Sequence, residues 1–354
     1  MEKLKVAVLG ATGLVGQRFV KLLVEHPFFD IVALTASPKS AGKKYRDATK
    51  WILGSEFPEK VEDLKVLETT PEAVKHCGYS IDIVFSALPS SIAREIEPQF
   101  AMEGFKVVSN ASAMRMFDDI PLIIPEVNPD HLNLLKAQHK KRGWKGFIVT
   151  SPNCSTSILT LTLKPIMDRL GIECVHVVTM QAVSGAGFSG VTSMAIIDNA
   201  IPFIAGEEEK IQSETLKILG TLSEDSIKMA DFKISASCNR ICVIDGHMEC
   251  VFLKTSCDAE IEEVEKLLSN FKSLPQQLKL PLAPENPVIV RREVDRPQPR
   301  LDRDEGKGMS VVVGRIRKGI DGWFKYVVLG NNVVRGAAGN AVLIGELLVK
   351  SWFV

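Results

Sequence analysis

A cysteine at a strand-to-helix turn is the residue of this chain best suited to covalent chemistry. Cys154 follows the apolar run 146–149 and the turn 151–153, and it precedes a second apolar run at 158–161. The first run is typical of a buried strand and the second of a helix, so Cys154 falls in the first helical turn. The positive end of the helix dipole stabilises a thiolate there and lowers the thiol pKa. The pattern therefore suggests a nucleophile.

A purely structural role fits the same neighbours equally well. A free cysteine is most often a small buried residue with no chemical task. The backbone N–H groups that follow Cys154 have no helical partner and could bind an oxyanion, but spacing alone does not decide between the two roles. A nucleophile needs a base, a substrate anchor and a second reactant, which must come from elsewhere in the sequence.

A glycine-rich turn near the N-terminus offers the second reactant. Gly10, Gly13 and Gly16 follow the buried strand 4–9 and open the helix 17–24. Glycines in this position allow a tight turn and let a pyrophosphate approach the helix N-terminus. We interpret the turn as a dinucleotide-binding loop rather than as a structural turn alone.

The end of the next strand indicates which dinucleotide. After the strand 31–34, residues 35–43 carry hydroxyls and lysines where an NAD-binding protein normally has a carboxylate for the ribose 2′-OH. A solvated basic loop is the alternative, but the pattern favours a 2′-phosphate and therefore NADP. The residues expected to contact the cofactor are Gly10, Thr12, Gly13, Leu14, Val15, Gly16, Ser37, Ser40, Ser86, Ser184, Gly185 and Asn332.

Polar residues in apolar surroundings mark the second half of the chain. Arg240 lies within a strand pattern, and an arginine there must pair with an anion, either a protein carboxylate or a ligand. His247 follows shortly after, although a lone histidine is more often structural than catalytic. The small-residue loop 181–190 would let a ligand approach the backbone, or it is only a flexible turn. The charges at 207–210 are usual for a solvated helix start.

The strand pattern predicts an α/β fold with two domains. Short apolar runs alternate with helical segments over residues 1–150, which indicates a doubly wound (Rossmann) parallel sheet that binds the dinucleotide. The C-terminal helix, 333–354, should complete this domain. Longer alternating strands over 151–332 indicate an α+β catalytic and dimerisation domain with a mixed, mainly antiparallel sheet. The Pro- and Arg-rich segment 280–304 is expected to be a surface excursion.

Composition excludes several classes of protein. The 354 residues are 45% hydrophobic and 24% charged with zero formal net charge, which gives no electrostatic case for nucleic acid or an anionic membrane. No apolar run has the length of a membrane span, and the chain enters a strand at once without a signal-peptide pattern. The seven cysteines form no CxxC pair, so we expect reduced thiols in the cytoplasm and no metal site.

Taken together, these segments resemble the aspartate-semialdehyde dehydrogenases, especially their archaeal and fungal branch. The elements that match are the loop 10–16, the segments 110–116 and 151–156, Gln181 with its glycine loop, Glu207 to Lys210, Arg240 with His247, and the segment 335–340. They occur in order over nearly the whole chain. The family often has Arg-Val-Pro-Val where this chain has Arg-Ile-Cys-Val at 240–243, a change that keeps Arg240 and His247.

The resemblance implies a reaction. Members of this family reduce β-aspartyl phosphate to aspartate semialdehyde with NADPH and release phosphate, in the pathway to lysine, threonine and methionine. Cys154 would form the acyl thioester, with His247 as its base and acid/base partner. The Cys154 amide and Asn153 would stabilise the oxyanion, and Gln181 would position the acyl group.

The resemblance also assigns the substrate contacts. Arg240 would grip the α-carboxylate bidentately. Glu207 would meet the α-ammonium, with Glu208 as the alternative. Lys210 and Arg115 would bind the leaving phosphate. Two cationic sites and one carboxylate thus face a substrate that is anionic at both ends and cationic between them.

Rival functions use much of the same sequence. Malonyl-CoA reductase shares the scaffold and the thioester chemistry, but its substrate lacks the ammonium and carries a CoA leaving group. N-acetyl-glutamyl-phosphate reductase is a more distant relative. A nucleotide sensor that binds NADP without turnover would have no use for a nucleophile. The resemblance and the large second sheet favour a homodimer or homotetramer.

Overall fold

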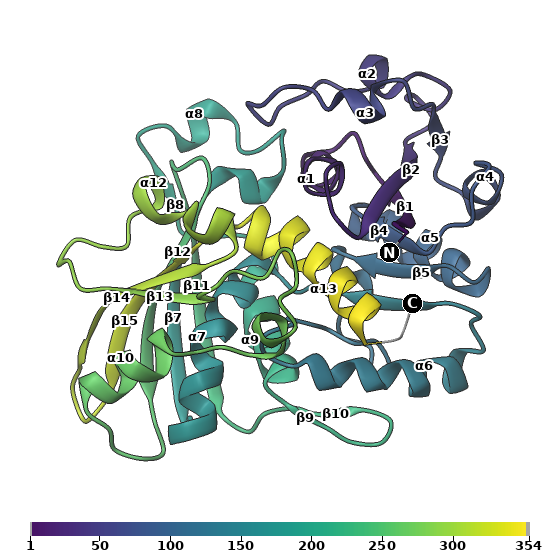
Figure 1. Cartoon of the computed structure of the whole chain (residues 1–354). Helices are drawn as coiled ribbons and strands as arrows, with labels where there is room; N and C mark the ends of the chain where they lie inside the picture. The colour runs from purple at the N-terminus through teal and green to yellow at the C-terminus, as the bar shows by residue number, and fades with distance from the viewer. Residues whose placement is uncertain (1, 352–354) are drawn as a thin grey trace.

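The first half of the chain is built on a six-stranded sheet in the computed structural model, which describes residues 2–351 (Figure 1). All its pairings are parallel, in the order β3-β2-β1-β4-β5-β6. The strands are β1 (Leu4–Leu9), β2 (Phe29–Ala36), β3 (Val66–Glu68), β4 (Ile83–Ser86), β5 (Lys106–Ser109) and β6 (Phe147–Thr150). This order is the doubly wound one, in which ligands bind beyond the carboxyl ends of the strands. The predicted Rossmann fold is confirmed.

Helices cover both faces of this sheet, because strands buried on two sides need apolar partners on each. The longer ones are α1 (Leu14–Leu23), α5 (Ser90–Met102) and α6 (Leu134–Arg142), and the shorter ones are α2 (Tyr45–Ala48), α3 (Glu59–Glu62), α4 (Pro71–Lys75), η1 (Ser112–Met114) and η2 (Pro129–Asn133). The sheet thus has the two buried faces that its near-continuous apolar strands require.

The second half contains a seven-stranded sheet in the order β13-β14-β15-β12-β7-β11-β8. Two of its pairings are parallel, β11 with β7 and β13 with β14, and the others are antiparallel. Its strands are β7 (Cys174–Gln181), β8 (Ala200–Ile201), β11 (Lys233–Ile241), β12 (His247–Lys254), β13 (Val288–Arg291), β14 (Val311–Lys318) and β15 (Phe324–Gly330); a separate ribbon pairs β9 (Thr221–Leu222) with β10 (Ile227–Lys228). The mixed, mainly antiparallel sheet is confirmed.

One face of the second sheet packs against helices and the other is open. The helices α7 (Cys154–Leu170) and α10 (Ile261–Ser269) pack on the sheet, and α9 (Glu207–Ile218) packs on α7 and β11 (Figure 1). The remaining short helices of this half are η3 (Val183–Ala186), α8 (Ser193–Ile196), α11 (Leu274–Gln277), α12 (Pro299–Asp302) and η4 (Glu305–Gly308). Because α7 begins directly after β6, it carries the chain from the first sheet to the second.

The C-terminal helix returns to the first sheet. A π-helical segment, η5 (Val334–Ala338), leads into α13 (Gly339–Lys350), which packs on α1, β4 and β5 between the two sheets (Figure 1). The sequence predicted a helix over residues 333–354. Instead, its first turn is π-helical, and residues 352–354 lie outside the described part. The domain boundaries at residues 150 and 332 stay a prediction.

The segment 280–304 is more than a surface excursion. The short β-branched run of β13 pairs parallel with β14 and forms an edge of the second sheet. Val288 is 1% exposed and belongs to the apolar core between the sheet and its helices. This strand is hard to recognise in the sequence, because it has only four residues and is flanked by prolines and arginines.

Gly13 and Gly16 of the glycine loop differ in the space that they leave for a side chain. A Cβ on Gly16 would lie 2.1 Å from the carbonyl oxygen of Gly10, whereas a Cβ on Gly13 would have its nearest neighbour at 3.6 Å. We therefore expect Gly16→Ala to lower the free energy of unfolding by about 3 kcal/mol through overpacking. The matched control Gly13→Ala should cost under about 1 kcal/mol. Urea denaturation measures both, and equal losses would contradict this account.

Candidate active site

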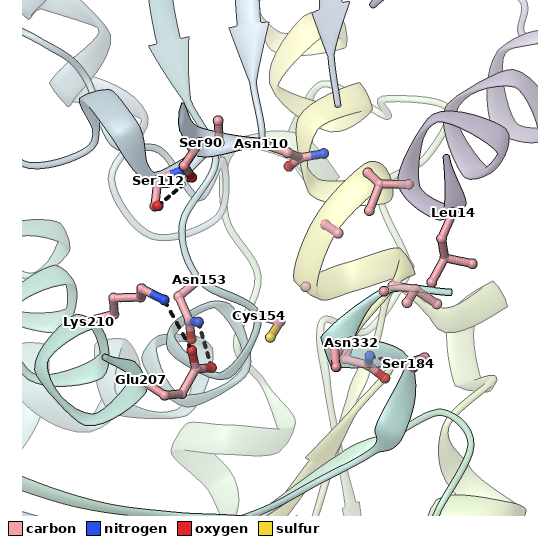
Figure 2. Close-up of a pocket in the computed structure, with 18 of the residues that line it drawn as sticks. Leu14, Ser90, Asn110, Ser112, Asn153, Cys154, Ser184, Glu207, Lys210 and Asn332 are labelled. Atoms are coloured by element: carbon pink, nitrogen blue, oxygen red, sulfur yellow. Dashed lines mark hydrogen bonds and ion pairs between the residues drawn. The ribbon is translucent and has the colours of Figure 1, made fainter. Parts of the chain in front are cut away.

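A cavity of about 570 Å³ lies where the carboxyl ends of the first sheet meet the N-terminus of α7 (Figure 2). Its lining comes from both halves of the chain: Leu14, Val15, Leu88, Pro89, Ser90, Asn110, Ala111, Ser112, Arg115, Pro152, Asn153, Cys154, Ser184, Gly185, Ala186, Gly187, Ile204, Ala205, Glu207, Lys210, Arg240, Asn332, Val333, Gly336 and Ala337. The structure therefore brings together Cys154 and most of the predicted substrate-binding residues.

The start of α7 is fixed by Asn153. Its side-chain oxygen accepts hydrogen bonds from the backbone N–H groups of Ser155 at 2.9 Å and Thr156 at 3.1 Å, so Asn153 is the N-cap. Its amide nitrogen donates to Glu207 Oε1 at 2.7 Å. This amide has a second N–H, which leaves one donor for a ligand. Cys154 follows as the first helical residue, with its sulfur toward the cavity (Figure 2).

Gly336 lets the last helical segment approach the thiol. A Cβ on Gly336 would lie 2.6 Å from Cys154 Cβ, closer than any real pair of such atoms. The first residues after β15 therefore pack directly on the start of α7. This close approach explains why small residues precede α13 in the sequence.

The expectation of a lowered thiol pKa is wrong for the free protein. Burial raises the pKa of Cys154 well above its usual range, and the nearby carboxylate of Glu207 raises it further. The charges of Arg115 and Arg240 act in the opposite direction but do not prevail. The helix dipole alone does not offset the cost of burying a thiolate beside the Glu207 carboxylate.

His247 lies directly behind the cavity wall. It is fully buried at the start of β12, and its Nδ1 accepts a hydrogen bond from the Ala182 backbone N–H at 3.1 Å. In the neutral ring the proton must therefore be on Nε2, which has no partner among the described residues. Burial, followed by the charge of Arg240, lowers the pKa of His247 from 6.5 to about 3.

Arg240 and His247 meet at one glycine. Arg240 Nη1 donates to the Ala182 carbonyl at 2.8 Å, so the two backbone polar groups of Ala182 each bind one of these side chains. Gly185 lies over them: an added Cβ would be 2.8 Å from Arg240 Nη1 and 3.1 Å from His247 Nε2. Gly185 and Arg240 both line the cavity, whereas His247 does not.

An acidic and a basic residue of α9 form a second wall. Glu207 Oε2 lies 3.6 Å from Lys210 Nζ, one helical turn along, while Oε1 is bound to Asn153 (Figure 2). Glu208 does not line the cavity, and its carboxylate accepts the Cys238 backbone N–H at 2.9 Å. Between the two predicted glutamates, only Glu207 is placed to meet a ligand.

Arg115 lines the cavity next to α9 and is bound to it. Its Nη1 donates to Glu214 Oε1 at 2.9 Å and its Nη2 to the Asn110 carbonyl at 2.7 Å. Its Nε is buried and, among the residues that the structure describes, has no partner. The side-chain amide of Asn110 is likewise unpaired there. Arg115 and Asn110 both line the cavity, but these unpaired atoms are themselves buried.

The predicted cofactor residues fall into three groups. Leu14, Val15, Ser184, Gly185 and Asn332 line the cavity, and Asn332 Nδ2 donates to Ser184 Oγ at 2.9 Å (Figure 2). The others lie beside it or beyond it.

The glycine loop lies beside the cavity, at the start of α1, and includes Thr12. Gly10 has a positive φ of 73°, and Gly13 caps α1 without any side-chain hydrogen bond. Ser37 and Ser40 follow β2 outside the cavity, and Ser37 is exposed. Ser86 is fully buried at the end of β4.

Some residues of the site escape sequence reasoning. Gln181 was predicted to position the acyl group, but it does not line the cavity. Its side-chain amide donates to Thr179 Oγ1 at 3.3 Å. Ser90, in contrast, lines the cavity and pairs with Ser112, the two Oγ atoms being 2.7 Å apart. The signal for Ser90 is only its place just after the carboxyl end of β4. Glu214, seven residues after Glu207, would follow from helical spacing.

Comparison with known proteins agrees with this architecture. The family model "Semialdehyde dehydrogenase, NAD binding domain" matches residues 5–135, and "Semialdehyde dehydrogenase, dimerisation domain" matches residues 163–335. An aspartate-semialdehyde dehydrogenase from Methanothermobacter thermautotrophicus is 55% identical over 97% of this chain and 98% of its own. The chain belongs to the aspartate-semialdehyde dehydrogenase family. The predicted resemblance is confirmed.

Two further relatives refine the picture of the family. The structure of the aspartate semialdehyde dehydrogenase from Candida albicans with NADP matches with a TM-score of 0.90, at 42% identity and full coverage of both chains. A "Malonyl CoA reductase (NADP)" from Metallosphaera sedula is 40% identical over 99% of this chain and 98% of its own. Family membership therefore establishes an oxidoreductase but does not by itself distinguish these two acyl substrates.

Residues 2–351 contain neither a candidate metal-binding cluster nor a candidate membrane span. No group of three or more His, Cys, Asp or Glu side chains in this range could hold a metal ion. Within the same range, no helix has the length and apolar character of a membrane span.

The buried His247 predicts a specific pH dependence of stability in this family member. Its pKa is lowered from 6.5 to about 3, so below pH 6.5 the unfolded chain takes up a proton that the folded one does not. The free energy of unfolding should then fall with decreasing pH, by up to about 1.4 kcal/mol per unit from this group. His247→Gln should remove that slope between pH 6 and about 4, as measured by urea denaturation. His76→Gln, at an exposed histidine, is the control and should leave it unchanged.

Proposed function

We propose that this protein reduces β-aspartyl phosphate to aspartate semialdehyde with NADPH, releasing phosphate, in the pathway to lysine, threonine and methionine. One observation carries the proposal: Cys154, Arg240, Glu207, Lys210 and Arg115 line a single cavity. A thiol nucleophile, a carboxylate for an ammonium and separate cations for two anionic groups are what this substrate requires. Family membership supports the same activity.

The chain offers a fitting site for NADPH. The N-terminal N–H groups of α1 are not capped by a side chain, so they are free to bind a pyrophosphate. The hydroxyls and lysines after β2 suit a 2′-phosphate. Leu14 and Val15 bring the start of α1 into the cavity beside Ser184 and Asn332. Bound there, NADPH would supply a hydride to the acyl carbon of the Cys154 thioester.

The first half-reaction forms the thioester. Cys154 sulfur attacks the acyl carbon, the carbon–oxygen bond to phosphate breaks, and phosphate leaves toward Arg115 and Lys210, taking up the thiol proton. The free protein keeps this thiol neutral. The substrate ammonium would offset the Glu207 charge that disfavours the thiolate, so binding and activation are linked. The free N–H of Asn153 and the Cys154 amide are donors for the oxyanion.

The tautomer of His247 limits what this side chain does. Because Nδ1 accepts from Ala182, neutral His247 presents an N–H at Nε2 and cannot accept a proton there. We therefore propose that it donates a hydrogen bond to the negative charge on sulfur or oxygen. A role as base would require the Ala182 contact to open first.

The open face of the second sheet is our candidate for a subunit interface. The dimerisation-domain model covers most of this sheet. Val178 and Phe252, on neighbouring strands, expose 37% and 41% of their surface, and Ile320 at the sheet margin exposes 81%. Covering this apolar face by another copy would give a homodimer, or a homotetramer if a further interface forms.

The choice of substrate is directly testable. With the protein, aspartate semialdehyde, phosphate and NADP should yield NADPH, and the yield should depend on phosphate. Cys154→Ala should lower this rate by at least about 10⁴-fold while the circular dichroism spectrum stays unchanged. Full activity in that variant would refute the thioester. Faster oxidation of NADPH by malonyl-CoA would instead establish the activity named for the Metallosphaera relative.

Arg240 provides a second test, at the carboxylate subsite. Lysine cannot hold the Ala182 carbonyl and a carboxylate with one planar fork, so Arg240→Lys should raise KM for aspartate semialdehyde by about 10–100-fold. KM for phosphate should change by less than about twofold, because phosphate binds elsewhere. A variant that unfolds, or one in which both constants rise together, would assign Arg240 a structural role.

A further inference from the structure

Glu214 is a buried carboxylate that the proposed reaction does not use. It lies in α9, only 1% exposed, seven residues after Glu207. Its Oε1 accepts from Arg115 Nη1 at 2.9 Å, and its Oε2 accepts from the Asn153 backbone N–H at 2.6 Å. One carboxylate thus joins the arginine of one cavity wall to the turn that carries Cys154.

The rest of α9 supports this link. Glu207, Glu214 and Lys217 lie seven and three residues apart, so one face of the helix presents them to the same loops. Lys217 is 3% exposed, and its Nζ donates to the carbonyls of Arg115 at 2.7 Å, Phe117 at 2.7 Å and Ile120 at 2.9 Å. The backbone of the Arg115 loop is held by Lys217, and its guanidinium is held by Glu214.

The two contacts of Glu214 constrain different parts of the reaction. Nη1 and Nη2 of Arg115 each use one N–H for the bond to Glu214 or to the Asn110 carbonyl, and each keeps a second N–H that could serve a ligand. Holding the Asn153 N–H fixes the residue immediately before the nucleophile. Charge-assisted hydrogen bonds to a buried carboxylate are short and directional, so both partners have little freedom.

We propose that Glu214 is a positioning residue, which sets the distance between the phosphate-binding guanidinium of Arg115 and the Asn153–Cys154 turn. The inference rests on the proposed function, because the phosphate role of Arg115 is assigned there. The attacked acyl carbon and the departing phosphorus are joined through one oxygen, so the nucleophile and the phosphate cation must stand at a fixed separation. Glu214 supplies that separation without touching the substrate.

The test replaces the carboxylate in two ways. Glu214→Gln keeps the shape, but its amide group turns one acceptor into a donor that faces Arg115 or the Asn153 N–H. Glu214→Asp keeps the charge, but it is one methylene too short to reach both partners. The matched control is Asp302→Asn, because Asp302 also accepts from an arginine, Arg296, and from a backbone N–H, that of Gln298, and does not line the cavity.

Two readouts separate positioning from structural support. Phosphate binding is measured without turnover, as the inorganic phosphate concentration that half-protects Cys154 from iodoacetamide, followed by peptide mass spectrometry. Turnover gives KM for phosphate and for NADP. Both Glu214 variants should weaken phosphate binding by about 10–100-fold in protection and in KM, with KM for NADP within about twofold. Asp302→Asn should lower the melting temperature and change neither phosphate value.

Other outcomes would overturn the inference. Unchanged or tighter phosphate binding in Glu214→Gln would show that the carboxylate only balances the Arg115 charge. Wild-type binding in Glu214→Asp would show that reach is irrelevant. If the wild-type protein neither binds phosphate nor turns over, the proposed function is wrong. The alkylation rate of Cys154 without ligand then decides: a change in both Glu214 variants but not in Asp302→Asn supports positioning, and no change refutes it.

Discussion

The site depends on how the first residue before α7 is held. Asn153 is bound by two carboxylates of one helix, its side chain by Glu207 and its backbone N–H by Glu214. Its own oxygen caps α7. Since α7 carries Cys154 and also joins the two sheets, any shift at Asn153 would move the thiol against both walls of the cavity. The remaining contacts of the site adjust groups around this fixed point.

Burial beside the Glu207 carboxylate disfavours the thiolate form of Cys154 in the free protein. Glu207 and burial together raise the pKa of Cys154, while Arg115 is already paired with Glu214 and exerts only part of its charge. A ligand with an ammonium and two anionic groups would reverse this balance, because it neutralises Glu207 as it binds the arginines. In the proposed reaction, the thiolate form of Cys154 would be favoured only with the substrate bound, which would limit side reactions of the thiol.

The sequence predicted those features that local pattern determines. The alternation of strands and helices predicted the doubly wound sheet, and the strand-turn-helix pattern placed Cys154 at the start of α7. The glycine loop predicted a helix from residue 17, whereas α1 already begins at Leu14. The tautomer of His247 could not be predicted, because it is set by the Ala182 N–H, sixty-five residues away. Helical spacing places Glu214 and Lys217 on the same face of α9 as Glu207, but their partners, about a hundred residues earlier, could not be predicted.

The pairing of Ala182 with both Arg240 and His247 shows how the backbone of one residue can couple two roles. Its carbonyl orients the guanidinium and its N–H selects the imidazole tautomer. Gly185 must lack a side chain so that both groups remain within reach of the cavity. The same small-residue turn that looks merely flexible in the sequence is therefore required by sterics. Its conformation determines whether His247 presents a donor to the charge that develops on sulfur or oxygen.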